Sequence, residues 1–246
     1  MLHLSEPLAV GELRVFYART DSVMTSEQLT HCRELLSPEE RARHLRFRFL
    51  ADQQSYLAAH ALTRGVLGQL LGEEAASLRF VVGERGRPEL PRPEREPRIR
   101  FNLSHTRGLA AFAVTLHDDV GVDVEHMGRR LDMERIAASA LSETEREALG
   151  LLQGDDRRKR FFDLWTLKEA YIKAVGMGLA LPLTSITLHV DPGPQPRVSF
   201  GPRITDDPAR WSFDVQTLSS GHTLAVALAR RALEPWHAQE LNPCDL

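Results

Sequence analysis

The sequence predicts an α+β protein made of two halves with similar topology. Each half contains a long helical pattern, at about residues 52–71 and 158–175, that precedes a β-prone run by a similar distance. The runs themselves are alike, because segments 104–114 and 220–228 share small apolar residues after a polar turn. Halves of this size are marginally stable alone, so we expect them to pack together. We place the N-terminal half at 1–119, the C-terminal half at 120–234 and a poorly ordered tail at 235–246.

Composition narrows the class of protein. The chain has 246 residues, of which 42% are hydrophobic and 26% charged, as in ordinary soluble globular proteins. No apolar run approaches the roughly 20 residues that span a bilayer, and the N-terminus lacks a signal-peptide pattern. Cys32 and Cys244 lie far apart in the sequence, with neither metal nor redox spacing. These features predict a cytoplasmic protein without a membrane partner, and the net charge of −3 argues against nucleic-acid binding.

The N-terminal half begins with an alternating pattern that predicts a strand over 11–18. Ser26 and Ser37 are candidate helix N-caps, and a basic helix is expected from Ser37 to about residue 49. The long helix over 52–71 ends at Gly72. A short strand over 77–82 and an exposed loop over 83–98 follow. Strands over 100–103 and 109–116 are then separated by a polar turn.

The C-terminal half begins with a strand over 120–124, followed by a helix over 133–141. Ser142 and Glu145 form a capping-box pattern that opens a further helix. The second long helix, over 158–175, comes next. Four strands are expected after it, over 184–190, 197–200, 211–218 and 223–229.

The second long helix carries two distinct faces. Leu164, Leu167, Tyr171 and Val175 recur at steps of three and four, which gives a buried stripe. Residues 165, 169 and 173 (Trp, Glu and Lys) share another face, where the tryptophan is expected to serve packing. The Glu–Lys pair is either a solvated salt bridge or part of a site.

An acidic strand, Gly121–Glu125, favours the second interpretation. Val122 and Val124 should face the core, while Asp123 and Glu125 emerge together on the opposite face. Neighbouring carboxylates repel each other, and a hard cation such as Mg²⁺ or Mn²⁺ would remove that cost. An exposed edge strand with solvated acids is the alternative.

Phosphate chemistry would have to rely on side chains, because the chain has no glycine-rich phosphate loop. The basic segment 41–48 is either a solvated helix face or a surface for a phosphate or an acidic protein. Ser104 and His105 are adjacent at a strand end, but no nucleophile-elbow motif accompanies them.

Four motifs, taken in order, resemble those of the 4′-phosphopantetheinyl transferases, in their longer, pseudodimeric Sfp-type branch. The motifs are Gly86-Arg87-Pro88, Phe101–His105, Gly121–Glu125 and Phe161–Leu179. The resemblance covers roughly residues 35–230, and the last two motifs at their spacing are highly specific.

The resemblance implies transfer of the 4′-phosphopantetheine arm of coenzyme A to a serine of an acyl or peptidyl carrier protein. Adenosine 3′,5′-bisphosphate is the by-product. The implied fold is a monomer of two similar α+β halves related by a pseudo-twofold axis, with coenzyme A in the cleft between them. Fatty-acid, polyketide and nonribosomal-peptide carriers all remain open as partners, and we expect carrier contacts between residues 127 and 152.

The resemblance also implies roles for individual residues. Mg²⁺ would be held by Asp123, Glu125 and Glu169. The residues that would contact phosphate oxygens are Lys168 and Lys173. His105 would contact the pyrophosphate, with Ser104 beside it. The adenine would be lined by Gly86, Arg87 and Pro88, and the 3′-phosphate met by Arg43 and Arg46.

Two assignments stay open in the sequence. Glu169 is the first candidate for the general base, with Lys173 stabilising the departing bisphosphate, but Glu145 is a second candidate or a plain capping residue. The helix after the basic segment has Ser55 or Tyr56 where relatives often carry a basic residue, so the 3′-phosphate contacts depart from the family pattern at this position. A catalytically silent scaffold and an unrelated Mg²⁺-dependent phosphohydrolase are the alternative functions.

Overall fold

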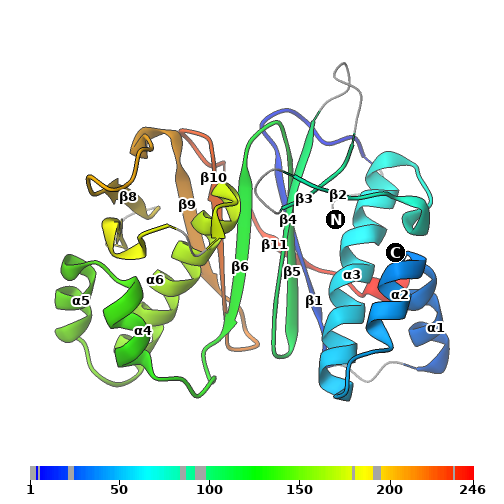
Figure 1. Ribbon diagram of the computed structural model, residues 1–246, viewed down its shortest axis with the longest axis horizontal. Helices are drawn as coiled ribbons and strands as arrows, with labels where there is room; N and C mark the ends of the chain where they lie inside the picture. The colour runs from blue at the N-terminus through cyan, green and yellow to red at the C-terminus, as the bar shows by residue number, and fades with distance from the viewer. Residues whose placement is uncertain are drawn as a thin grey trace. The chain divides into compact units, whose positions relative to one another are not determined.

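The computed structural model describes residues 4, 6–21, 25–83, 87–91, 98–178, 181–190, 195–234 and 236–246. The chain divides into two compact units (Figure 1). The first unit contains Met1–Glu84, Pro88–His117 and Pro235–Leu246, and the second contains Arg85–Arg87 and Asp118–Glu234. Each unit combines helices with a mainly antiparallel sheet, so the predicted α+β class is confirmed.

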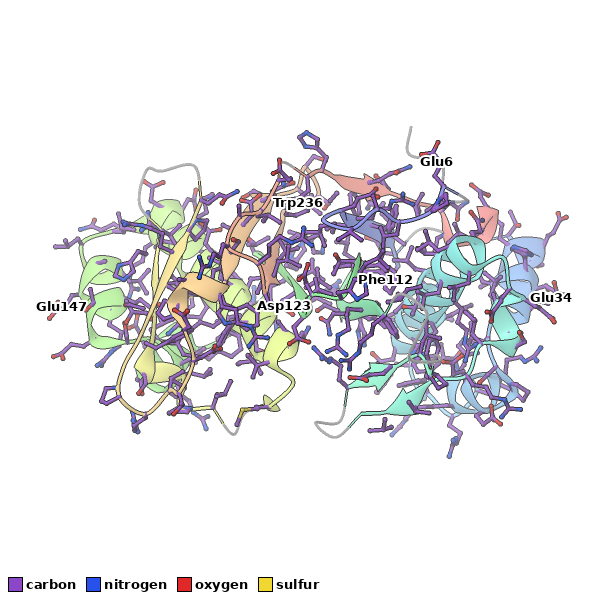
Figure 2. All side chains as sticks on the ribbon, turned by 90° about the horizontal axis from the view of Figure 1, so that it is seen from above. Glu6, Glu34, Phe112, Asp123, Glu147 and Trp236 are labelled. Carbon is purple, nitrogen blue, oxygen red and sulfur yellow. The ribbon has the colours of Figure 1, made fainter. Side chains whose placement is uncertain are left out.

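The first unit is built on a four-stranded sheet in the order β11-β1-β5-β4. Its elements are β1 (Leu13–Arg19), α1 (Ser26–Glu34), α2 (Pro38–His44), α3 (Leu50–Leu71), η1 (Ala75–Ser77), β2 (Val81–Val82), β3 (Pro88–Glu89), β4 (Ile99–Thr106), β5 (Leu109–Leu116), β11 (Ala238–Glu240) and η5 (Pro243–Asp245). Helix α3 lies against this sheet, and α1 and α2 pack on the side of α3 that faces away from the sheet (Figure 1). Phe112 of β5 is enclosed, whereas Glu34 extends from α1 into solvent (Figure 2).

The second unit is built on a three-stranded sheet in the order β6-β10-β9, with a separate β7-β8 hairpin. Its elements are β6 (Val120–His126), α4 (Met133–Ala140), α5 (Glu143–Gly150), α6 (Gly154–Val175), η3 (Leu183–Ser185), β7 (Ile186–His189), β8 (Arg197–Phe200), η4 (Pro208–Arg210), β9 (Ser212–Thr217) and β10 (His222–Leu228). Helix α6 lies against β6 and β10, and α4 and α5 lie beyond it (Figure 1).

The two units share one order of elements. In each, a strand (β1 or β6) precedes a helix of 22 residues (α3 or α6), and an antiparallel hairpin (β4-β5 or β9-β10) comes after the helix. The last hairpin strand, β5 or β10, is buried throughout and pairs between the first strand and its hairpin partner. The similar topology expected from the sequence is therefore present.

Several expected boundaries differ from those observed. The basic helix ends at His44, and the expected strand over 77–82 is only β2, preceded by η1. Ser104 and His105 lie within β4, since the hairpin turn is Arg107-Gly108 with a positive φ at the glycine. The expected loop over 83–98 includes β3, which pairs with β2, while 84–86 and 92–97 lie outside the described residues.

The expectation of a poorly ordered tail is wrong. Residues 238–240 form β11, which pairs in parallel with β1, and η5 contacts α1 and α3. Leu246 fills the space beside Gly65 of α3. Apolar contacts and strand pairing with distant segments order this stretch, and its own sequence shows neither.

No helix in the described part of the chain is long and apolar enough to cross a membrane.

Candidate functional site

The candidate site forms where β6 and α6 of the second unit meet. A glycine permits this contact, because a Cβ at Gly121 would lie 1.9 Å from the carbonyl oxygen of Ala170. No L-amino-acid side chain fits at that distance from helix backbone. The close approach brings Asp123 and Glu125, the next residues on the same face of β6, opposite α6.

Lys173 and Trp165 make the contacts between the helix and the acidic strand. Lys173 Nζ lies 2.6 Å from Asp123 Oδ1, and Trp165 Nε1 donates to Glu125 Oε1 at 3.3 Å. Asp123 is only 5% exposed, so the alternative of solvated acids on an exposed edge does not describe this strand. Trp165 packs against the apolar core of this unit, as expected, and it also donates a hydrogen bond to an acid of the site.

The third carboxylate, Glu169, lies one helical turn before Lys173. Burial, together with the charges of Asp123 and Glu125 and against the opposing charge of Lys173, raises the pKa of Glu169 to about 7. Burial also raises the pKa of Glu125, and Asp123 adds to that shift. The charge of Asp123 thus destabilises the charged forms of Glu125 and Glu169 in a poorly solvated region.

The donor set suits a hard divalent cation. All three side chains offer oxygen, and the repulsion among them is what a bound cation would relieve. Within the described ranges, however, no three His, Cys, Asp or Glu side chains are placed as a ready metal cluster. The residues therefore fit Mg²⁺ in chemistry, and ligation would require Lys173 and the carboxylates to adjust.

Lys168 does not lie where the resemblance implied. It is fully buried, and its ammonium donates to the carbonyl oxygens of Ala140, Leu183 and Ile186 at 2.8, 3.0 and 2.6 Å. It also pairs with Glu145 at 2.6 Å. Four oxygens surround the ammonium, so a phosphate contact does not fit this position.

Glu145 is also a buried residue with partners inside the protein. It is 3% exposed and accepts hydrogen bonds from the backbone amides of Ser142 and Leu188 at 2.7 and 2.8 Å. With Lys168 as a third partner, its carboxylate has no access to an incoming serine. The capping-box interpretation of Glu145 holds, and the alternative role as general base does not fit.

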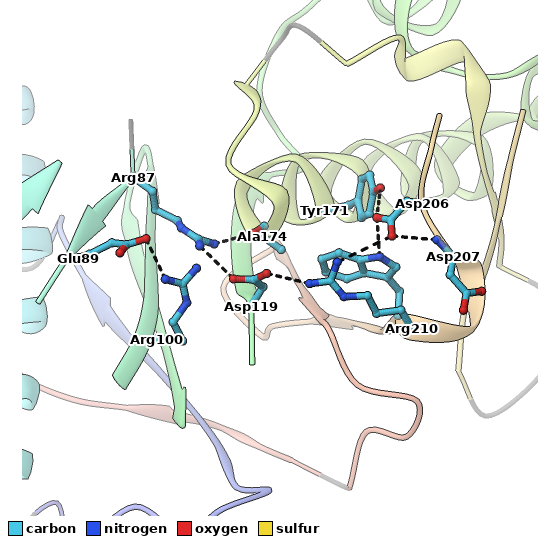
Figure 3. Close-up of polar contacts among 10 residues, drawn as sticks. Arg87, Glu89, Arg100, Asp119, Tyr171, Ala174, Asp206, Asp207 and Arg210 are labelled. Carbon is cyan, nitrogen blue, oxygen red and sulfur yellow. Dashed lines mark hydrogen bonds and ion pairs between the residues drawn. The ribbon is translucent and has the colours of Figure 1, made fainter. Parts of the chain in front are cut away.

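Arg87 belongs to the second unit and binds the C-terminal end of α6. Its guanidinium donates to the carbonyl oxygen of Ala174 at 2.5 Å and to Asp119 at 3.0 Å (Figure 3). Tyr171, near the same end of α6, donates its hydroxyl to Asp206 at 2.8 Å (Figure 3). Pro88 lies in β3 of the first unit, and Gly86 lies outside the described residues.

The other expected ligands belong to the first unit. Arg43 and Arg46 are exposed on and just after α2, and the Arg43 guanidinium lies 5.8 Å over the Tyr56 ring. Ser104 is buried in β4, and the neighbouring His105 is exposed. The structure pairs Lys173 with Asp123 and places Glu125 and Glu169 within electrostatic reach of Asp123, all in the second unit.

One site residue could have been recognised from the sequence. Trp165, Glu169 and Lys173 follow one another at intervals of four on α6, so a face with two charged members was already a candidate site face. Arg129, which donates to Glu125 at 3.3 Å, carried no such signal.

Both parts of the chain match families of known proteins. Residues 119–229 match the 4′-phosphopantetheinyl transferase superfamily, and residues 24–117 match the 4′-phosphopantetheinyl transferase N-terminal family. The first of these matches contains the whole acidic strand and α6.

Relatives match over most of the chain. The 4′-phosphopantetheinyl transferase HetI of Nostoc sp. is 32% identical over 212 residues, which cover 85% of this chain and 86% of the relative. The 4′-phosphopantetheinyl transferase Sfp of Bacillus subtilis is 29% identical, over 73% of this chain and 78% of the relative. A solved holo-(acyl-carrier-protein) synthase of Bacillus anthracis covers 46% of this chain and 96% of its own at TM-score 0.38 and 22% identity, and it carries no part of the assignment. The chain belongs to the 4′-phosphopantetheinyl transferase superfamily, and within it to the Sfp-like type.

Proposed function

We propose that this enzyme transfers the 4′-phosphopantetheine arm of coenzyme A to a serine of an acyl or peptidyl carrier protein. The reaction converts the apo carrier to the holo form and releases adenosine 3′,5′-bisphosphate. The supporting observation is the junction of β6 and α6, where three carboxylates and one lysine meet in a poorly solvated region.

In this proposal the residues that would hold Mg²⁺, or Mn²⁺ in its place, are Asp123, Glu125 and Glu169. A bound divalent cation neutralises charge on pyrophosphate oxygens and aligns the reacting groups. The support is the oxygen-only donor set and the raised pKa values of two of its members, Glu125 and Glu169.

Two residues of α6 accept the proton and stabilise the leaving group. The serine hydroxyl must lose a proton as its oxygen attacks the β-phosphorus, and Glu169 accepts that proton directly or through a water molecule. Lys173 follows one turn later on the same face, where its ammonium stabilises the negative charge of the departing bisphosphate. Both groups come from α6, so their spacing is set by one rigid helix.

The nucleotide contacts remain proposals from the resemblance. Arg43 and Arg46 would meet the 3′-phosphate, and Gly86, Arg87 and Pro88 the adenine. His105 and Ser104 would meet the pyrophosphate. The exposed positions of Arg43 and Arg46 are compatible with an anionic ligand. Lys168 and Glu145 are left out of this set because of their buried partners.

Mass spectrometry of an apo carrier protein tests the function. The purified enzyme, coenzyme A and Mg²⁺ should add the mass of one phosphopantetheine arm to the carrier, and a chelator should prevent the addition. A catalytically silent scaffold would bind coenzyme A or the carrier without changing the carrier's mass. Absence of the added mass on fatty-acid, polyketide and nonribosomal-peptide carriers alike would contradict the proposal.

We further propose that the enzyme acts as a cytoplasmic monomer without nucleic-acid or membrane partners. Light scattering coupled to size-exclusion chromatography tests the oligomeric state, and cell fractionation tests the location. A dimer mass at working concentration would contradict the first statement.

A further inference from the structure

The long helices of the two units each carry one buried cation at the same position. Arg64 lies 14 residues after Leu50, the first residue of α3, and Lys168 lies 14 residues after Gly154, the first residue of α6. Arg64 is 3% exposed and Lys168 is fully buried. Each cation also lies eight residues before a C-cap glycine in the left-handed conformation, Gly72 in α3 and Gly176 in α6.

The partners of the two cations correspond as well. Arg64 pairs with Glu40 and donates to the carbonyl oxygens of Ala75 and Leu78, which follow α3. Lys168 pairs with Glu145 and donates to two carbonyls that follow α6, those of Leu183 and Ile186.

Both carboxylates come from a capping box. Glu40 accepts from the amide of its N-cap residue Ser37 at 3.1 Å, and Glu145 accepts from the amide of its N-cap residue Ser142 at 2.7 Å. In each unit, then, one ion pair ties the long helix to the start of a neighbouring short helix and to the chain that leaves the long helix. Such a recurrence in two halves indicates a role in the architecture, because nothing in the first unit's α3 resembles the site face of α6.

The two long helices differ in the residues that lie beside the buried cation. Glu169 and Lys173 lie one and five positions after Lys168, where the first unit has Gly65 and Gln69 after Arg64. Successive residues of an α-helix are about 100° apart around its axis, so fixing the direction of Lys168 also fixes the directions of its neighbours. The direction of the site face of α6 is therefore coupled to the direction of Lys168.

We propose that Lys168 and Glu145 are positioning residues of the transferase, which hold α6 in the rotation that brings Glu169 and Lys173 to Asp123. Neither residue contacts substrate or transfers a proton. The inference rests on the proposed function, since it assigns these two residues a part in that reaction. Removing one partner leaves the other charge buried and unpaired, whereas removing both charges together is far better tolerated.

The experiment compares two double variants of the full-length enzyme. Lys168→Met with Glu145→Gln removes the pair of the second unit, and Arg64→Met with Glu40→Gln removes the matched pair of the first. Both should lower the midpoint of thermal unfolding by a similar amount. Only the first should lower kcat, by roughly tenfold or more, because a small rotation of α6 misplaces the reacting groups.

Calorimetric titration with Mg²⁺ alone gives a readout that does not depend on turnover. The variant of the second unit should bind Mg²⁺ several-fold more weakly than the wild type, and the variant of the first unit should bind it equally well. Lys168→Arg should retain most of kcat, since Arg64 shows that this helix position accommodates an arginine.

Three outcomes would overturn the inference. One is a folded second-unit variant with wild-type kcat and Mg²⁺ affinity. Another is an increase in KM for coenzyme A at unchanged kcat, which would indicate a phosphate contact by Lys168. The third is an equal loss of Mg²⁺ affinity in both double variants, which would indicate a merely structural role. Failure of the proposed function appears separately, as a wild-type enzyme that transfers nothing.

Discussion

The two units of this enzyme use the same order of strand, 22-residue helix and hairpin for different purposes. Phe112 and Ala225 are equivalent, because each lies four residues after the positive-φ glycine of its hairpin, Gly108 or Gly221. Ala225 pairs with Asp123 of β6, whereas Phe112 pairs with Phe16 of β1. Phe16 belongs to the apolar core against α3. Asp123 instead pairs with Lys173 of α6.

The helices differ in the same way. The site face of α6 carries Trp165, Glu169 and Lys173, and the matching positions of α3 carry Ala61, Gly65 and Gln69. The backbone arrangement is thus insufficient for the chemistry, which comes from a few polar residues at one helix–strand contact. The first unit therefore supplies matched controls for the second.

The largest effect is expected at Glu169. Glu169→Gln removes the carboxylate proposed to hold the cation and accept the serine proton, so kcat for carrier modification should fall by roughly 10²–10⁴-fold. Carrier mass spectrometry at fixed time points measures the loss. Gln69→Ala, five residues after the buried cation of the first unit, should leave kcat unchanged. Normal turnover by the Glu169 variant would remove this residue from both proposed roles.

Gly121→Ala should damage the same contact through the backbone. The added methyl group would lie 1.9 Å from the carbonyl of Ala170, and only separation of β6 from α6 relieves that clash. We expect a loss of about 3 kcal/mol in unfolding free energy, together with reduced transfer. Urea unfolding measures the first and the carrier assay the second. Gly150→Ala is the control, because nothing lies within 4 Å of a Cβ there.

The ion pair between Arg64 and Glu40 in the first unit should make the free energy of unfolding depend on pH in the acid range. Burial alone would raise the pKa of Glu40, but hydrogen bonds from His60 and Arg64 outweigh it and lower the pKa from 4.5 to about 2. Because the folded-state pKa is depressed, the stabilisation is complete above about pH 4.5 and is lost as the pH falls toward 2.

Glu40→Gln should therefore lower unfolding free energy at pH 7 by roughly 2–3 kcal/mol, and the difference from wild type should shrink between pH 4.5 and 2. Urea unfolding across that range measures the trend. Glu34→Gln, at an exposed carboxylate of α1, should show no such convergence. A constant difference at every pH would mean that Glu40 acts through packing and not through its charge.

The smallest effect is expected at Trp165. Trp165→Phe keeps an aromatic ring but removes the donor to Glu125, a hydrogen bond of 3.3 Å to a charged acceptor. We expect a loss of about 1 kcal/mol in Mg²⁺ binding, which corresponds to roughly fivefold weaker affinity. Calorimetric titration measures it. An unchanged affinity would leave packing against the core as the only role of Trp165.

Local patterns in the sequence determined the elements that now carry the site. The spacing of Leu167, Tyr171 and Val175 indicates a helix with a separate charged face, and strand alternation puts Asp123 and Glu125 on a common side. The capping box at Ser142 is also present as expected. These predictions succeed because periodicity, capping and pairing act between residues a few positions apart.

Tertiary structure alone decided which distant groups meet. Lys168 has the motif position of a phosphate ligand, yet the carbonyls of Leu183 and Ile186 and the carboxylate of Glu145 enclose it. Cys32 and Cys244, 212 positions apart, lie with their sulfurs 2.9 Å from each other because η5 packs on α1. Burial and hydrogen bonding depend on what the rest of the chain places around a side chain, and no local spacing contains that information.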